Sequence, residues 1–269
     1  MRSHFFKVFV CFLFSAQLAF SQGRVDGFLK GEGNIDLVLG GGYEIAGKYY
    51  AGTNKIDLGR AIANVNLFIA AGLTDRIDLN LSIPYVMISN TRSIQDGALF
   101  LKMKIVEKEM WDGVLSGIMA AGVSTYLANY QTEGFSAIGQ QATTIDFRPL
   151  LHYQHNTGWF ATLQFPYIYK FNPVPTAINP SLKVGRAHAN YYFDIWYEHQ
   201  TSFGGRDYQG TPAPTTFREL GVDFHKLGGT FYLPLFDRLG TFAGVSYVLS
   251  GRNIGKGFGL NAGIVLKSK

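Results

Sequence analysis

Apolar residues in this chain alternate with polar or small residues at every second position over stretches of about ten residues. The segment 76–88 shows this clearly, and one of its faces would carry Ile77, Leu79, Leu81, Ile83, Tyr85 and Met87. Its other face would carry Asp78, Asn80 and Ser82. Successive side chains of a β-strand point to opposite faces, whereas a helix would need a period of about 3.6 residues. The pattern therefore predicts strands that are apolar on one face only.

The composition indicates that these strands face lipid. Charged residues make up 16% of the chain, against about 25% in ordinary soluble domains. After residue 21 no uninterrupted apolar stretch reaches the roughly 20 residues that a spanning helix needs, and the nearest candidate, 114–128, is interrupted by small and polar residues. Only helices and closed barrels satisfy every backbone hydrogen bond in lipid. We therefore predict an all-β fold, a transmembrane antiparallel up-and-down β-barrel, with a secreted β-sandwich as the soluble alternative.

Twelve segments have strand character, and the connections between them alternate between short turns and longer polar segments. The expected strands are residues 34–46, 57–71, 76–88, 97–107, 113–126, 142–154, 159–171, 178–186, 191–203, 216–234, 240–250 and 256–267. An even number places both chain ends on the periplasmic side, where outer-membrane barrels have their short turns. The tenth strand changes facing near Gly228 and Gly229, which predicts a bulge there. The eighth strand has a weak pattern, and ten or fourteen strands stay open as alternatives.

The first 21 residues predict export. Arg2 and Lys7 precede an apolar run that is too short to span a membrane, and small residues precede a cut after Ser21. This is the layout of a cleaved signal peptide, so we expect 1–21 to be removed and 22–269 to form the barrel domain in the outer membrane.

The expected partners follow from the charge and from the residue types. Loss of Arg2 and Lys7 lowers the formal net charge from +5 to +3, an excess too small to predict nucleic-acid binding. Outer-membrane lipid and small-molecule solutes are the partners that we expect. The single cysteine, Cys11, lies in the segment to be removed, and no clear cluster of histidines and carboxylates remains. We therefore expect no metal and no cofactor.

Strand alternation also assigns polar residues to the barrel lumen. The lumen-lining candidates are Asp36, Asp78, Asn80, Lys102, Lys104, Asp146, Arg148, Lys170, Lys183, Asp194 and Glu198. One interpretation is a polar permeation path. The other is a network of ion pairs that fills a narrow barrel, because buried charges need partners.

Aromatic residues gather near both ends of the expected strands. Those beside short turns are Trp159, Tyr191 and Tyr192. Those beside longer segments are Tyr169, Phe171, Tyr197 and Phe203. The arrangement predicts two aromatic belts at the two membrane interfaces.

Several short motifs resemble one family. These are the run 72–76 (Gly-Leu-Thr-Asp-Arg) with the strand end 82–85 (Ser-Ile-Pro-Tyr), the pair Tyr43-Glu44, and the run 251–257 between the last two strands. Together they resemble the family of outer-membrane transporters linked to the meta-pathway of phenol degradation. The resemblance implies a barrel that moves small, often apolar or aromatic, compounds. One departure is the C-terminus, which ends in Lys269 and not in the aromatic residue of many such barrels.

Three functions follow from these patterns. The first is passive passage of small, apolar or aromatic solutes through a channel or transporter, which would not be an enzyme. The second is a plugged structural or adhesive barrel that acts through its outer loops. The third is a lipid hydrolase, because His199 and Thr201 share the outward face of a strand near a long loop, and a hydroxyl nucleophile needs a base within hydrogen-bond reach.

Overall fold

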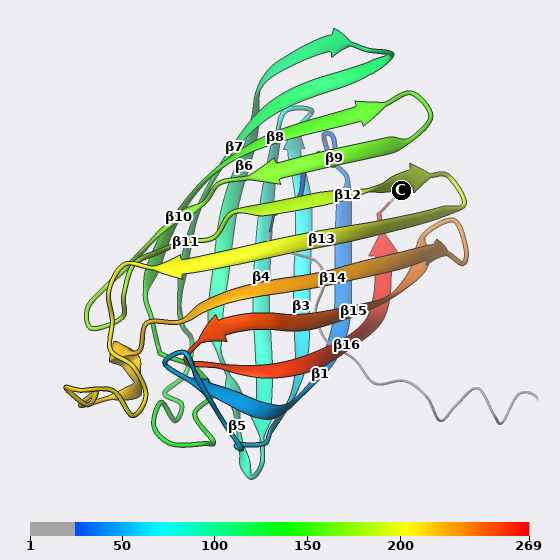
Figure 1. The fold of residues 1–269 in the computed structure, drawn as a ribbon. Helices are drawn as coiled ribbons and strands as arrows, with labels where there is room; N and C mark the ends of the chain where they lie inside the picture. The colour runs from blue at the N-terminus through cyan, green and yellow to red at the C-terminus, as the bar shows by residue number, and fades with distance from the viewer. Residues whose placement is uncertain (1–24, 269) are drawn as a thin grey trace, which may run out of the picture.

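A computed structural model describes residues 25–268, and most of these residues lie in strands (Figure 1). The expected signal peptide, 1–21, and the cut after Ser21 lie outside the described residues. Within residues 25–268, no helix has the length and apolar character that crossing a membrane requires.

The strands form one closed antiparallel sheet. Their bounds are β1 Ile35–Ala51, β2 Asn54–Ile56, β3 Arg60–Thr74, β4 Ile77–Ile88, β5 Thr91–Ile94, β6 Asp96–Met110, β7 Gly113–Tyr126, β8 Thr144–His155, β9 Trp159–Gln164, β10 Tyr167–Lys170, β11 Ala177–Ile178, β12 Ser181–His188, β13 Tyr191–Ser202, β14 Asp223–Pro234, β15 Leu239–Arg252 and β16 Ile254–Lys267. Each pairs with its neighbours, and β1 closes the barrel against β16. β9 and β10 share one wall position, as do β11 and β12, while β2 and β5 extend hairpins. The wall therefore has twelve strands, which confirms the predicted barrel class and strand number.

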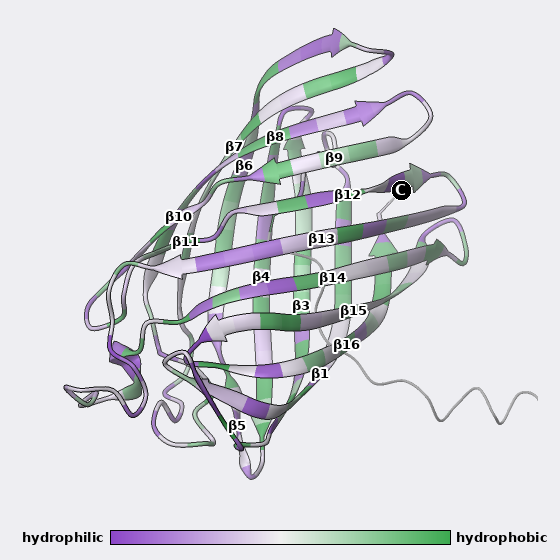
Figure 2. Cartoon of the chain, viewed as in Figure 1, coloured by the Kyte–Doolittle hydropathy of each residue, from purple (hydrophilic) through white to green (hydrophobic). Residues whose placement is uncertain are grey.

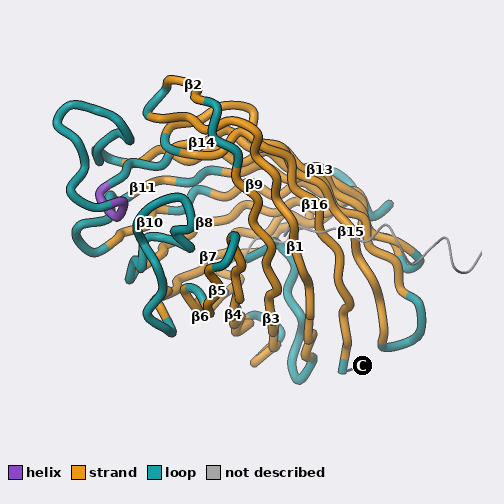
Figure 3. The backbone as a smooth tube through the Cα atoms, turned by 90° about the horizontal axis from the view of Figure 1, so that it is seen from below, coloured by secondary structure: helices purple, strands orange, loops and turns teal. Residues whose placement is uncertain are grey.

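The two ends of the barrel differ. Short turns and both the start of β1 and the end of β16 lie at one end, which we call the short-turn end. The connections 127–143 and 203–222 lie at the other, the long-loop end, where Figure 3 shows the loops gathered on one side of the strands. Both ends of the barrel sheet thus meet at the short-turn end, as an even strand number requires.

The wall has an apolar outer face and a mixed inner face. In β6, Leu99, Leu101 and Met103 are exposed, while the alternate residues Phe100 and Lys102 are buried. Figure 2 shows the result as short hydrophobic and hydrophilic bands along single strands. An outer face of this kind suits lipid, because no polar side chain interrupts the exposed row at these positions.

Several wall strands differ in detail from the expected strands, and β1, for instance, continues past residue 46 to Ala51. β14 begins at Asp223, and residues 216–222 belong to a loop with a 3₁₀ turn at Phe217–Glu219. The β14–β15 pairing shifts its register between His225 and Lys226, where β15 carries the extra residue Leu249, so the prediction of a bulge at the glycine pair was wrong. The expected strands 159–171 and 178–186 are each interrupted before a proline, which has no N–H to donate to the ladder.

Gly228 of the glycine pair has a different role, in packing, and Gly122 of β7 has the same role. A Cβ on Gly228 would lie 2.2 Å from the Trp196 ring, and one on Gly122 would lie 2.3 Å from the Phe100 ring. Glycine at these two positions therefore makes room for a large inward ring on the neighbouring strand.

The aromatic residues that were assigned to the two belts do not all lie on the outer face of the wall. The outward and exposed members are Trp159, Tyr169, Phe171, Tyr197 and Phe203. Tyr192 instead points into the lumen, where its hydroxyl donates to Asp194 Oδ2 at 2.6 Å and its ring stacks on Phe160. Its assignment to a belt was wrong, because neighbouring residues of a strand face opposite sides.

Candidate functional site

Residues 25–34, the N-terminal segment, run inside the barrel before β1 begins. Val25 is 1% exposed and packs against Phe100, Ile118 and Leu150 on the inner faces of β6, β7 and β8. Gln164 of β9 donates its side-chain amide to the Val25 carbonyl at 3.3 Å. The segment therefore occupies part of the lumen.

Aromatic packing holds the next residues of this segment. The Phe28 ring lies edge-on to His152 at 4.7 Å and to Phe160 at 5.0 Å. Gly27 passes so close to β8 that a Cβ would lie 2.2 Å from His152 Nδ1. Only glycine fits this approach, so the path of the segment depends on the absence of a side chain at position 27.

Lys102 is the charged centre of the lumen. Its side chain is 1% exposed and its Nζ lies 3.0 Å from Asp78 and 3.1 Å from Asp26. The same Nζ donates to the Phe28 carbonyl, and the Lys30 N–H donates to the Asp78 carboxylate. Wall and segment thus share one network, in which each buried charge has a partner of opposite sign.

The N-terminal segment ends at a glycine-rich turn. Gly31 and Gly33 have φ values of +76° and +72°, a region that glycine enters at little cost. Gly33 donates to the Gly72 carbonyl at 2.9 Å, and Gly72 donates to the Asn34 carbonyl at 2.8 Å. The segment is therefore fixed to the wall at the short-turn end, immediately before β1.

Two cavities lie within the lumen. The upper cavity, toward the long-loop end, has a volume of about 670 Å³, and the sequence-predicted residues that line it are Asp146, Arg148, Lys170 and Glu198. The lower cavity, toward the short-turn end, has a volume of about 380 Å³ and is lined by Asp36, Asn80, Lys102 and Lys183 among the predicted residues. The lower cavity also contacts Asp26, Phe28 and Lys30, so the N-terminal segment forms part of its wall.

The other predicted lumen residues lie beside these cavities. Asp78 and Asp194 are buried and pair with Lys102 and Lys183. Lys104 lies nearer the short-turn end and pairs with Glu107, which is half-exposed. The further inner ion pairs are Asp146 with Arg148 at 2.8 Å, Lys226 with Glu44 at 3.4 Å, and Lys30 with Asp36.

The connection 127–143, which we call the inner loop, folds over the upper cavity. Ile138 is buried against Val86 and Ile88, and residues 138–140 line the cavity. The Tyr130 hydroxyl donates to Asp96 at 2.6 Å and accepts from the Gln141 N–H at 2.8 Å. Burial and the Asp96 carboxylate raise the pKa of Tyr130 well above its usual range, so its hydroxyl stays protonated and keeps this contact.

A second long connection holds the inner loop from the other side. The Glu133 carboxylate accepts from the Phe217 N–H at 3.0 Å and from the Thr216 hydroxyl. The Gln140 amide donates to the Leu220 carbonyl at 3.0 Å, and Arg218 Nε donates to the Gln140 carbonyl at 2.9 Å. The inner loop and the connection 203–222 therefore form one assembly at the long-loop end.

The His199 strand was the alternative site for lipid hydrolysis. Thr201 Oγ1 lies 2.8 Å from His199 Nε2, and His199 Nδ1 lies 3.2 Å from the Phe224 carbonyl oxygen. The His199 ring stacks on His225 with centroids 4.3 Å apart. A base that faces a hydroxyl on one side and an acceptor on the other has the geometry of a nucleophile pair, although the acceptor is a main-chain carbonyl and not a carboxylate.

Sequence reasoning missed the N-terminal segment and the inward course of the inner loop. Apolar residues at Val25, Phe28 and Leu29, immediately before the first strand, were the signal for the segment. Tyr130, Ala137 and Ile138 gave a weaker signal within the inner loop. Neither has the periodicity that identifies a strand, so neither stood out.

Comparisons with known proteins agree with this architecture. No family model matches the sequence, and no curated protein sequence matches it. The fold is similar to the COG4313 outer membrane channel from Pseudomonas putida F1, with a TM-score of 0.70, 15% identity, and 93% of this chain and 100% of that chain covered. It is also similar to the NanC porin, with a TM-score of 0.53, 8% identity, and 86% and 98% covered. At these identities the likeness establishes the fold.

Proposed function

We propose that the protein is an outer-membrane channel for passive passage of small, apolar or aromatic solutes, exported with a signal peptide at 1–21. The observation that carries the proposal is the lumen: a closed wall with an apolar exterior encloses two cavities of about 670 and 380 Å³. The N-terminal segment, which is not a strand of the wall, fills part of the space between the two cavities.

The N-terminal segment is the element whose displacement would widen the path. It is held by side-chain contacts and by hydrogen bonds to Asp78 and Gln164, and it is outside the sheet ladder. Moving it breaks fewer backbone hydrogen bonds than opening a strand pair would, and unmade backbone bonds in lipid are costly. Its turn at Gly31 and Gly33 would serve as the hinge.

The solute class has two supports. The resemblance to the transporters linked to phenol degradation implies small apolar or aromatic compounds. The rings of Phe28, Phe160 and Tyr192 form a cluster within the lumen, and aromatic faces favour aromatic solutes.

The test is solute entry into liposomes that contain the folded protein, with empty liposomes as the control. Liposomes that contain a sugar-permeable porin are the second control. Compared with that porin, we expect faster entry of a small aromatic acid and slower entry of small sugars. No entry of either solute into liposomes with verified barrel folding would overturn the proposal.

The second candidate is a plugged structural or adhesive barrel, which the ion pairs of the lumen favour. Lys102, Arg148 and Lys183 each face a carboxylate within 3.3 Å, and paired charges fix a structure in place. This candidate expects no flux both from the natural chain and from variants with a displaced N-terminal segment.

The third candidate, lipid hydrolysis, is supported by the contact between His199 and Thr201. Fatty-acid release is measured in the same liposomes. Release that is lost in His199→Ala and kept in His225→Ala would establish it, and no release from the natural chain removes it.

A further inference from the structure

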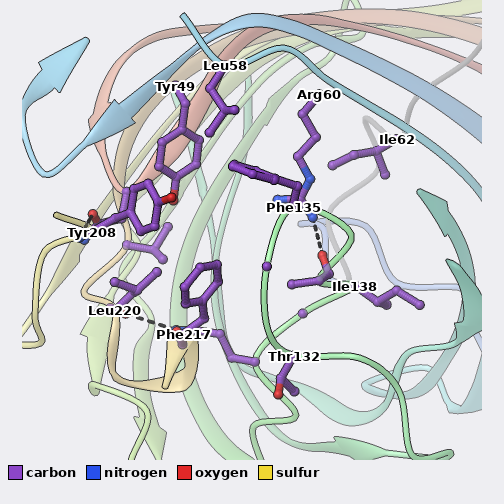
Figure 4. Close-up of a pocket in the computed structure, with 16 residues that line it drawn as sticks. Tyr49, Leu58, Arg60, Ile62, Thr132, Phe135, Ile138, Tyr208, Phe217 and Leu220 are labelled. Carbon is purple, nitrogen blue, oxygen red and sulfur yellow. Dashed lines mark hydrogen bonds between the residues drawn. The ribbon is translucent and has the colours of Figure 1, made fainter. Parts of the chain in front are cut away.

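A second kind of cavity lies outside the lumen, among the long loops. We call it the loop pocket; its volume is about 240 Å³, and it lies between β1, the start of β3, the inner loop and the connection 203–222. Figure 4 shows side chains from all of these elements converging on it (Figure 4). It shares Ile62 and residues 138–140 with the upper cavity, so the two spaces are neighbours across the inner loop.

One wall of the loop pocket is a row of aromatic rings. Tyr208 lies edge-on to Tyr49 with centroids 5.8 Å apart, and edge-on to Phe217 at 5.4 Å. Leu220 is buried beside this row, and Phe135 of the inner loop is 60% exposed and also lines the pocket. Exposed aromatic and aliphatic surface in a concave site is what an apolar ring would cover.

Arg60 is the charged residue that lines this pocket. Its Nη2 donates to the Ala137 carbonyl, while its Nε is buried and has no hydrogen-bond partner. Arg60 takes part in none of the ion pairs formed within residues 25–268. A buried donor without an acceptor is unfavourable, and a ligand that supplies the acceptor removes that cost.

The aromatic row and the open donor of Arg60 together define the ligand. A guanidinium is a planar fork of donors that matches a carboxylate, with two parallel hydrogen bonds. The aromatic row suits one flat ring, and the volume lies below the roughly 300–1,000 Å³ of sites for drug-sized ligands. We propose that the loop pocket binds a small single-ring aromatic carboxylate, with its carboxylate on Arg60 and its ring between Phe217 and Phe135.

This inference rests on the proposed function for its meaning, since the loop pocket would be the first binding site on the way to the upper cavity. The binding itself is independent of passage. It is therefore measured on the folded protein in detergent micelles, by calorimetric titration with benzoate, and flux is measured separately in liposomes.

The probes separate charge from ring. Benzoate is compared with benzyl alcohol, which keeps the ring and lacks the charge, and with acetate, which keeps the carboxylate and lacks the ring. We expect benzoate to bind at least tenfold more tightly than either, because benzyl alcohol lacks the charge-assisted hydrogen bonds to Arg60 and acetate lacks the ring contact.

The variants separate the pocket from the rest of the surface. Arg60→Gln should weaken benzoate at least tenfold and leave benzyl alcohol unchanged, and Phe217→Ala should weaken both. Arg92→Gln is the matched control, because Arg92 is an exposed arginine of β5 that does not line the loop pocket. Arg60→Lys, which keeps the charge and loses the fork, is the second variant in case Arg60→Gln fails to fold.

The outcomes distinguish the two proposals. Benzoate binding that depends on Arg60 but comes with no flux supports the loop pocket and overturns the channel. Flux with no benzoate binding overturns the loop pocket and leaves the channel. Equal benzoate affinity in Arg60→Gln and Arg92→Gln also overturns the loop pocket.

Discussion

The lower lumen and the loop pocket both contain a cation near aromatic rings, but the two cations are satisfied differently. Lys102 faces two carboxylates and a main-chain carbonyl. Arg60 donates to one main-chain carbonyl and keeps a buried Nε with no acceptor. A cation whose partners belong to the chain fixes a structure, whereas one with an open donor is available to a ligand. The comparison predicts that substitutions in the lower lumen change stability and flux, and that those at the loop pocket change binding.

Removing the lumen cation gives the largest expected effect. Lys102→Met leaves the buried Asp78 carboxylate without its cation, which costs about 3–5 kcal/mol of unfolding free energy, and it removes the cation that pairs with the partly exposed Asp26. It also removes a contact that holds the N-terminal segment, so sugar flux should rise. Urea unfolding of the folded protein measures the first effect, and liposome entry measures the second.

The matched control for that substitution is Lys104→Met. Lys104 pairs with the half-exposed Glu107 at the short-turn end, and such a pair contributes about 0–1 kcal/mol. An equal loss of stability in both variants would show that the buried network has no special role.

Displacing the N-terminal segment without changing a charge gives the next largest effect. In Gly27→Val, the new Cβ would collide with the His152 ring, which lies 2.2 Å from that position. The segment must then leave β8, and sugar flux should rise several-fold at little cost in stability of the wall. Gly47→Val is the control, because nothing lies within 4 Å of a Cβ there. Unchanged flux in Gly27→Val would mean that the segment does not limit passage.

The smallest effect concerns the contact between the long loops. Partial burial by itself would raise the pKa of Glu133, but hydrogen bonds from Thr216 and Phe217 outweigh it and lower that pKa. A carboxyl group whose pKa is lower in the folded than in the unfolded chain stabilises the folded chain when the pH lies above its unfolded pKa of about 4.3. This stability is lost as the pH falls through the folded pKa. We therefore expect the two loops to stay joined at neutral pH and to loosen in acid, by less than about 1 kcal/mol.

The protection of residues 128–142 from hydrogen–deuterium exchange, with each rate divided by the intrinsic rate at that pH, is compared at neutral pH and at about pH 3 to measure this loosening. In Glu133→Gln the amide oxygen keeps an acceptor that does not titrate, so the loss of protection in acid should disappear. The same loss of protection in the natural chain and in this variant would contradict the assignment to Glu133.

The limits of sequence reasoning are visible at particular residues. Alternation alone put Asp146 and Arg148 on one face of a strand, and both line the upper cavity. The alternation that Tyr192 shares with Asp194 also places Tyr192 in the lumen, so its assignment to an aromatic belt contradicted the pattern of its own strand. The expected tenth strand also began too early, at residue 216. No local pattern in residues 216–222 distinguishes this loop from a strand.

The sequence by itself determined the class of fold and the side that most strand residues face, and it favoured twelve wall strands. These depend on a period of two residues and on short turns, which are local properties of the chain. Tertiary structure alone decided the course of the N-terminal segment and the loop pocket. Their contacts join residues far apart in sequence, such as Lys30 with Asp78 across 48 positions and Arg60 with Ala137 across 77. No local pattern specifies contacts at that separation, because they form only when the closed wall brings the residues together.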